Sequence, residues 1–210
     1  CYSFDHVTVT IDPLPVITLG PSDIFCVNDT VVLLTSFNPV GGTWEGDGVV
    51  DDAAGTFDAE IGVGDWDLFY WYTDPTTQCS DTVSHLVTVQ DIPAVYAGPD
   101  VTFCNQPIPA QLLGYSPGLF DGGIGVFAGV GAASVAVTPS GMFDPSAVVN
   151  GTYEVVYTFT DAITGCTNTD TLSVLVTDPI VAYAGEDINV CINAPQFFLE
   201  DFEPEVGIQW

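Results

Sequence analysis

The sequence predicts an all-β protein built from tandem β-sandwich domains, and three observations lead to this prediction. Short runs rich in Val, Thr, Tyr and Phe alternate with clusters of Gly, Pro, Asn and Asp, the pattern of strands joined by turns. No segment has a helical period of useful length. The same motifs also return along the chain, first after the 78 residues that separate Cys26 from Cys104.

The strand-like runs are clearest at residues 30–35, 66–73, 152–160 and 172–177. Alternation along 66–73 puts Trp66, Leu68, Tyr70 and Tyr72 on one face of the strand and Asp67, Phe69, Trp71 and Thr73 on the other. One of these faces must lie in the core. About seven short strands in roughly 80 residues, with turns between them, predict an immunoglobulin-like sandwich.

The repeat gives the expected domain organisation. Residues 1–15 are the tail of a preceding repeat, 16–93 and 94–179 are complete repeats, and 180–210 begin a following one. The second complete repeat is longer, and its extra residues lie in a loop rich in Gly, Ala and Val around 118–138. We therefore expect the sequence to be a segment of a longer protein.

The charge of the chain excludes several functions. It has 28 acidic residues and no Lys or Arg, for a formal net charge of -28. Nucleic acids and anionic membrane surfaces need cationic partners, so neither is an expected partner. A phosphate-binding loop with its Lys and Schiff-base chemistry are excluded for the same reason. Disorder does not follow from the charge, because 47% of the residues are hydrophobic and such a chain can bury a core.

Each complete repeat has one Cys near its start and one near its end. The simplest pairing lies within the repeat, Cys26 with Cys79 and Cys104 with Cys166, while Cys1 and Cys191 would pair outside the chain. Free buried thiols are the alternative. The cysteines are not clustered as zinc ligands are. Repeated pairs indicate an oxidising compartment, so we expect a secreted, cell-surface protein.

Several motifs of the repeat resemble a known family. They are Ala97-Gly-Pro-Asp100 before Cys104, residues 42–48 (Gly-Thr-Trp-Glu-Gly-Asp-Gly), Phe143-Asp-Pro145, and Tyr157-Thr-Phe-Thr-Asp161 with Gly165-Cys166. This pattern resembles the PKD-like immunoglobulin repeats of large Bacteroidota surface adhesins, including SprB-type gliding adhesins. The resemblance implies an extended rod of such domains, export by the type IX system, and a role in surface adhesion or gliding motility. The lack of Lys and Arg departs from ordinary family members.

Carboxylates flank every linker between repeats. Calcium prefers oxygen ligands, so a calcium ion at the domain junctions is the one metal that the sequence suggests, and no cofactor is required. The alternative is that these residues are solvated turn residues. The candidate ligands are Asp12, Asp23, Asp91, Asp100, Asp178 and Asp187.

Three Asp-Thr-aliphatic triplets resemble the acceptor of Bacteroidota O-glycosylation. The resemblance implies glycans on Thr30, Thr82 and Thr171 and a glycoprotein. The alternative is that these threonines belong to ordinary strand edges, where Thr is common.

The leading hypothesis for function is a structural and adhesive repeat segment of a bacterial surface filament, a disulfide-stapled acidic stalk. Its expected partners are other repeats of the same chain, neighbouring copies in a filament, and an extracellular surface or glycan. The runner-up is a set of glycan-binding accessory modules of a secreted polysaccharide-degrading enzyme, with surface aromatics stacking on sugars. A third hypothesis is side-by-side assembly screened by cations. An enzyme is not expected, because an active site is rarely duplicated in each small repeat and no nucleophile motif is present.

Overall fold

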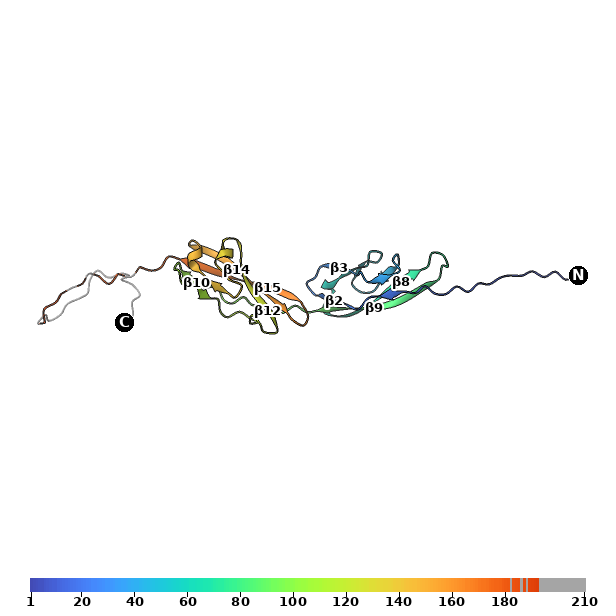
Figure 1. The fold of residues 1–210 in the computed structure, drawn as a ribbon, viewed down its shortest axis with the longest axis horizontal. Helices are drawn as coiled ribbons and strands as arrows, with labels where there is room; N and C mark the ends of the chain where they lie inside the picture. Colours follow the sequence, from blue (N-terminus) through green and yellow to red (C-terminus); the bar gives the residue numbers. More distant parts are fainter. Residues whose placement is uncertain (182, 186, 188, 193–210) are drawn as a thin grey trace. The chain divides into compact units, whose positions relative to one another are not determined.

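The computed structural model describes residues 1–181, 183–185, 187 and 189–192 (Figure 1). These residues form two compact units. The first comprises residues 1–95, 117–125 and 158–169, and the second comprises 96–116, 126–157 and the described part of 170–210. Strands dominate both units, which confirms the predicted all-β class. The helices of the described residues are three short 3-10 turns, η1 (Ala59–Ile61), η2 (Gly131–Val135) and η3 (Pro145–Ala147).

The larger sheet of the first repeat has four strands in the order β2-β9-β8-β5 (Figure 1). They are β2 (Asp23–Cys26), β9 (Ser80–Gln90), β8 (Gly64–Thr73) and β5 (Thr43–Glu45). The edge strand β2 runs parallel to β9, while β9 pairs with β8 and β8 pairs with β5 in antiparallel orientation. Chain order and sheet order therefore differ, because a parallel neighbour requires a long connection.

A second sheet of this repeat has the order β3-β7-β6. Its strands are β3 (Val31–Leu33), β7 (Thr56–Asp58) and β6 (Val49–Asp51), and a small pair joins β1 (Thr18–Leu19) to β4 (Phe37–Asn38). A four-stranded sheet and a three-stranded sheet match the seven-strand arrangement of an immunoglobulin-like sandwich. The predicted fold class is therefore confirmed.

The core of the first repeat lies between these sheets. It is formed by Leu34, Trp44, Phe57, Ala59, Leu68, Tyr70, Val87 and Val89. Tyr70 is buried with its hydroxyl satisfied, because Oη donates to the Pro39 carbonyl at 2.7 Å and accepts from the Gly42 N–H at 2.8 Å. Trp66, Leu68, Tyr70 and Tyr72 all contact this core, as the alternation along 66–73 predicts.

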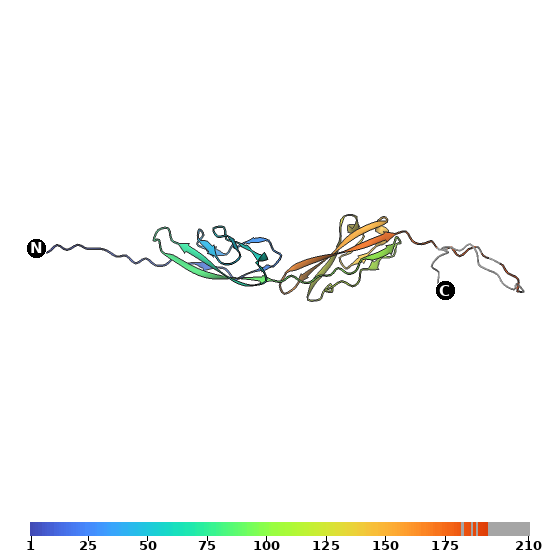
Figure 2. The same cartoon turned by 180° about the vertical axis from the view of Figure 1, so that it is seen from behind.

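The second repeat repeats the larger sheet with the order β10-β15-β14-β12 (Figures 1 and 2). Its strands are β10 (Val101–Cys104), β15 (Thr167–Thr177), β14 (Gly151–Asp161) and β12 (Gly123–Gly129), and β11 (Ala110–Gln111) pairs with β13 (Met142–Phe143). The edge strand β10 is again parallel to the last strand, β15. The repeat found in the sequence is therefore also a repeat of the structure.

The segment 118–138, expected to be a loop, contains β12 and η2 instead. Buried Gly125 and Phe127 alternate with exposed Ile124 and Val126, so the segment has the period of a strand. Gly123 is needed for packing, since a Cβ at this position would lie 2.6 Å from Cζ of the Phe159 ring. Glycine here allows close approach of two strands and does not mark a loop.

The compact units do not coincide with the predicted repeats. The first unit ends its main segment at Val95, two residues beyond the predicted boundary, and it also includes 117–125 and 158–169. The ranges 16–93 and 94–179 therefore stay predictions from sequence. Most of the predicted repeat at 180–210 lies outside the described residues.

Core packing leads to a first prediction. Phe57 is completely buried, so Phe57→Ala should lower the free energy of unfolding by about 3–5 kcal/mol through lost burial and the cavity left behind. Urea denaturation measures this change. Phe120→Ala is the matched control, because that ring is 85% exposed and its loss should leave the unfolding midpoint almost unchanged. Equal effects of the two substitutions would contradict the described core.

Candidate functional site

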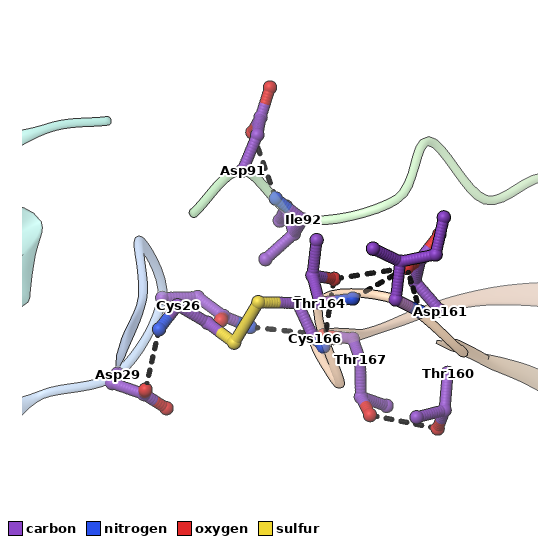
Figure 3. The surroundings of a disulfide bond; sticks show 11 residues. Cys26, Asp29, Asp91, Ile92, Thr160, Asp161, Thr164, Cys166 and Thr167 are labelled. Atoms are coloured by element: carbon purple, nitrogen blue, oxygen red, sulfur yellow. Dashed lines mark hydrogen bonds between the residues drawn. A yellow bond between two sulfur atoms is a disulfide. The ribbon is translucent and has the colours of Figure 1, made fainter. Parts of the chain in front are cut away.

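A disulfide joins Cys26, the last residue of β2, to Cys166 in the loop between β14 and β15 (Figure 3). The two cysteines are 140 residues apart in sequence, and their Cα atoms are 5.6 Å apart. Cys166 is fully buried, and both cysteines belong to the first compact unit. In terms of the sequence repeat, the bond connects the first repeat to the second.

This pairing replaces the predicted bonds Cys26–Cys79 and Cys104–Cys166. Cys26 lies opposite Gln90 at the end of β9, whereas Cys79 directly precedes Ser80 at its start. Because β9 has 11 residues, the two cysteines lie about 36 Å apart along it at roughly 3.3 Å per residue. A disulfide needs Cα atoms within about 7 Å, so the predicted bond cannot form.

The same register separates the cysteines of the second repeat. Cys104 lies opposite Thr177 at the end of β15, while Cys166 directly precedes Thr167 at its start. The unbonded cysteines among the described residues are Cys1, Cys79, Cys104 and Cys191. Sequence reasoning missed the pairing because it had the spacing of the cysteines but not the length of the strand between them. That length is indicated by residues 80–90, which contain no Gly, Pro or Asn that would end a strand.

The loop that carries Cys166 is held by Asp161. Its Oδ1 accepts hydrogen bonds from the backbone N–H groups of Ile163 and Thr164, both at 2.8 Å (Figure 3). The Thr164 Oγ1 in turn accepts from the Cys166 N–H at 3.1 Å. The loop is closed by the Asp161 N–H, which donates to the Cys166 carbonyl at 2.9 Å. The cysteine is therefore presented by an ordered turn.

The loop that carries Cys79 has the same construction. The Asp74 Oδ1 accepts from the N–H groups of Thr76 at 2.7 Å and Thr77 at 3.2 Å, and the Cys79 N–H donates to the Thr77 Oγ1 at 3.3 Å. The Asp74 N–H donates to the Cys79 carbonyl at 2.9 Å. An Asp-x-x-Thr-x-Cys pattern thus specifies the turn in both repeats.

Hydrogen bonding lowers the pKa of both loop aspartates below the ordinary value of 3.8. For Asp161 the main cause is the Thr164 N–H, followed by that of Ile163, and for Asp74 it is the Thr76 N–H, followed by that of Thr77. These donors favour the charged form of an acceptor carboxylate. Ionised aspartate therefore stabilises both cysteine loops.

Contacts on the Cys26 side hold the other half of the bridge. The Cys26 N–H donates to the Asp29 Oδ2 at 2.8 Å (Figure 3). The Val27 N–H donates to the Gln90 carbonyl at 2.9 Å. The Asn28 side-chain amide donates to the Thr167 carbonyl at 3.3 Å, next to Cys166. The bridge is thus accompanied by polar contacts on both of its ends.

The six candidate calcium ligands are not gathered into a site. Within the described ranges, no group of three or more His, Cys, Asp or Glu side chains is placed to hold a metal ion. Asp23 contacts His85, with 2.9 Å between Oδ2 and Nε2, and Asp100 accepts from the Ser173 N–H at 2.8 Å. Asp91 accepts from the Ile92 N–H at 2.9 Å, while Asp12, Asp178 and Asp187 are exposed. Junction calcium stays a prediction.

The three candidate glycosylation sites differ in accessibility. Thr30, just before β3, and Thr171, within β15, are exposed. Thr82 lies within β9 opposite Trp71 and is partly buried. Modification of these residues stays a prediction.

The outer face of β8 carries two exposed aromatic rings. Phe69 is 43% and Trp71 is 47% exposed, as expected for the face opposite the core. Trp71 lies between Thr43 of β5 and Thr82 of β9, and Phe69 lies between Glu45 and Ser84 in the same strands. Of the other aromatics near this strand, Trp44 and Tyr70 are buried, and Trp66 and Tyr72 are half-buried against the core. Two rings flanked by hydroxyl and carboxylate groups are therefore what remains at the surface.

In the part of the chain that the structure covers, no helix is long and apolar enough to cross a membrane.

The loop aspartates lead to a second prediction. Their folded-state pKa lies below the ordinary value, so the stability they contribute is complete above about pH 4 and is lost as pH falls through the folded pKa. The melting temperature should therefore fall less steeply below pH 4 in the double variant Asp74→Asn/Asp161→Asn than in the wild type. Thermal melts from pH 2 to pH 7 measure this. Asp47→Asn, at an exposed aspartate outside these loops, is the control, and an unchanged pH profile in the double variant would refute the role of the loops.

No family model and no curated protein matches the chain. It is similar to a solved SusE-like surface-located polysaccharide-binding protein from the heparin utilisation locus of Bacteroides thetaiotaomicron, with 11% identity over 81% of this chain and 35% of that chain and a TM-score of 0.42. It is also similar to Drosophila N-cadherin EC1-3, with 12% identity over 77% of this chain and 66% of that chain and a TM-score of 0.33. The insect immune protein hemolin matches with 13% identity over 77% of this chain and 46% of that chain and a TM-score of 0.30. The chain spans less than two thirds of the length of each of these three structures.

Proposed function

We propose that this chain is a structural repeat segment of an extracellular surface adhesin, in which successive immunoglobulin-like domains are joined by disulfides as well as by the backbone. The observation that carries this proposal is the bond between Cys26 of the first repeat and Cys166 of the second. Disulfides persist in oxidising compartments, which supports an extracellular location. The acidic composition supports the proposed stalk, because neighbouring copies of like charge repel one another and stay apart.

The strand order suits a segment that carries tension. The chain enters the large sheet of the first repeat through β2 and leaves it through β9, and these two strands are parallel neighbours. When the bond between Cys26 and Cys166 is reduced, tension applied before β2 and after β9 pulls the two strands in opposite directions along their length. All hydrogen bonds between them are then loaded together and must break together. Such a shear arrangement resists force better than one in which the bonds open singly. With the bond intact, tension passes from Cys26 directly to Cys166 and bypasses β9.

The finer role rests on the family resemblance of the repeat motifs. It is a disulfide-stapled acidic stalk or filament in surface adhesion or gliding motility, exported by the type IX system and glycosylated at Thr30, Thr82 and Thr171. Calcium at the repeat junctions would add stiffness to such an extended rod.

A second candidate function is recognition of neutral glycans by the outer face of β8. Exposed aromatic rings offer flat apolar surfaces, and the flanking groups at Thr43, Glu45 and Thr82 supply hydrogen-bonding partners for sugar hydroxyls. The fold does not need these rings, because Val156 and Thr158 occupy the equivalent positions of β14 when Tyr70 is matched to Tyr157. The ligand would be uncharged, since 28 carboxylates without a Lys or Arg repel polyanionic glycans.

A third prediction tests the stalk by single-molecule pulling on both ends of the chain. The disulfide shields the residues between Cys26 and Cys166 from extension, so the oxidised chain should lengthen by about 460–500 Å less than the variant Cys26→Ser, given 140 residues at roughly 3.3–3.6 Å each. Cys79→Ser is the matched control and should behave as the wild type.

Full extension of the oxidised wild-type chain would overturn the proposed stalk.

Location is tested separately, with antibodies against the chain on the cells that produce it. Labelling of intact cells is expected. Labelling only after permeabilisation would rule out a surface role.

A fourth prediction tests the aromatic face. Trp71→Ala should weaken binding to neutral cello-, manno- or xylo-oligosaccharides by about tenfold, which corresponds to about 1.4 kcal/mol. Isothermal titration measures the affinity, and heparin serves as an anionic probe that should not bind. Phe120→Ala removes another exposed ring outside this face and should have no effect. Unchanged binding in Trp71→Ala, or no binding by the wild type, would remove glycan recognition as a function of this face.

A further inference from the structure

We propose that Cys79 and Cys104 are the two halves of further bridges of the same kind, each completed by another repeat. Cys104 would bond to the loop cysteine of a following repeat, and Cys79 to the strand-end cysteine of a preceding repeat. Every repeat would then be covalently linked to both of its neighbours. The inference concerns the connectivity of the repeats and holds for either proposed function.

Cys104 occupies the position of Cys26. Each is the last residue of an edge strand that runs parallel to the final strand of its sheet, opposite Thr177 and Gln90 respectively. The residue after each cysteine also makes the same contact, since the Asn105 N–H donates to the Thr177 carbonyl at 2.7 Å and the Val27 N–H to the Gln90 carbonyl at 2.9 Å. Cys104 is exposed and carries a free thiol.

Cys79 occupies the position of Cys166. The Asp-x-x-Thr-x-Cys turn presents both, with an aspartate that accepts two backbone N–H groups and a threonine hydroxyl that accepts from the cysteine N–H. The turn places a residue with positive φ directly before each cysteine, Gln78 at 62° and Gly165 at 75°. Gln78 adopts this backbone although L-residues other than glycine seldom do, so the same loop shape is kept in both repeats.

Neither free cysteine can pair within its own repeat, because the two cysteines of a repeat lie at opposite ends of β9 or β15. The observed bond instead joins Cys26, the strand-end cysteine of the first repeat, to Cys166, the loop cysteine of the second. The geometry therefore assigns each strand-end cysteine to the loop cysteine of the next repeat.

The bond forms by thiol–disulfide exchange with a small disulfide such as oxidised glutathione. One cysteine thiolate attacks the glutathione disulfide and releases one glutathione thiol, and the second cysteine then attacks the mixed disulfide and releases another. Two cysteine thiols are oxidised, one glutathione disulfide is reduced, and the two thiol protons end on the two glutathione molecules.

The test uses the full chain with residues 94–179 inserted once more after residue 179. In the inserted copy, Cys104→Ser removes the second strand-end cysteine, so that the first Cys104 is the candidate partner of the new Cys166. Ile163→Val in the same copy, at a side chain that is 93% exposed, distinguishes the new Cys166 peptide by its mass. The protein is folded with glutathione, alkylated and digested with chymotrypsin, since trypsin has no Lys or Arg to cut after. The expected product is a peptide pair that joins the first Cys104 to the marked Cys166, leaving three reactive thiols instead of five.

A free Cys104, or Cys104 bonded to the Cys166 of its own repeat, would overturn the proposal. In the control, Cys166→Ser in the inserted copy should leave Cys104 open to alkylation. A second chain, with residues 16–93 inserted once more before residue 16, tests Cys79 in the same way. It should contain a bond from the first copy's Cys26 to the second copy's Cys79, while Cys79 recovered as a free thiol in both copies would refute that half of the proposal.

Discussion

The parallel pairing of β2 with β9 is the constraint on which the rest of the structure depends. It sets Cys26 beside Gln90, at the end of the sheet where the chain leaves the first repeat. It also leaves Cys79 a full strand length away, at the start of β9. The same pairing of β10 with β15 recurs in the second repeat. One register thus determines which cysteines can meet and along which direction the strands resist tension.

Much of the fold could be predicted because it depends on local patterns. The alternation along 66–73 has the period of a strand, and it correctly divides Tyr70, in the core, from Trp71, at the surface. The segment 118–138 was misjudged because glycine usually marks turns. Gly123 is there because β14 approaches too closely for a side chain, which is a contact between residues distant in sequence.

The site could be predicted only in part. The sequence identifies the cysteines and an oxidising compartment, but connectivity cannot be deduced from spacing alone. The cysteine that Cys26 or Cys166 can reach depends on strands that are neighbours in the sheet but far apart in the sequence. Likewise, acidic residues at every linker suggest a shared metal ion, whereas the structure gives Asp23 and Asp100 separate partners in their own sheets. Composition specifies which groups are present, and topology decides which of them meet.

The bond between Cys26 and Cys166 makes the intervening chain a closed covalent ring. A single backbone cut inside this ring, for example at the exposed Phe120, opens the ring but does not divide the molecule. The two pieces stay joined through sulfur, and the strands on either side of the cut keep their partners. A fibre made of such rings tolerates a nick inside a ring without losing its continuity. It is severed when the disulfide of a nicked ring is reduced, or when a cut falls outside the rings.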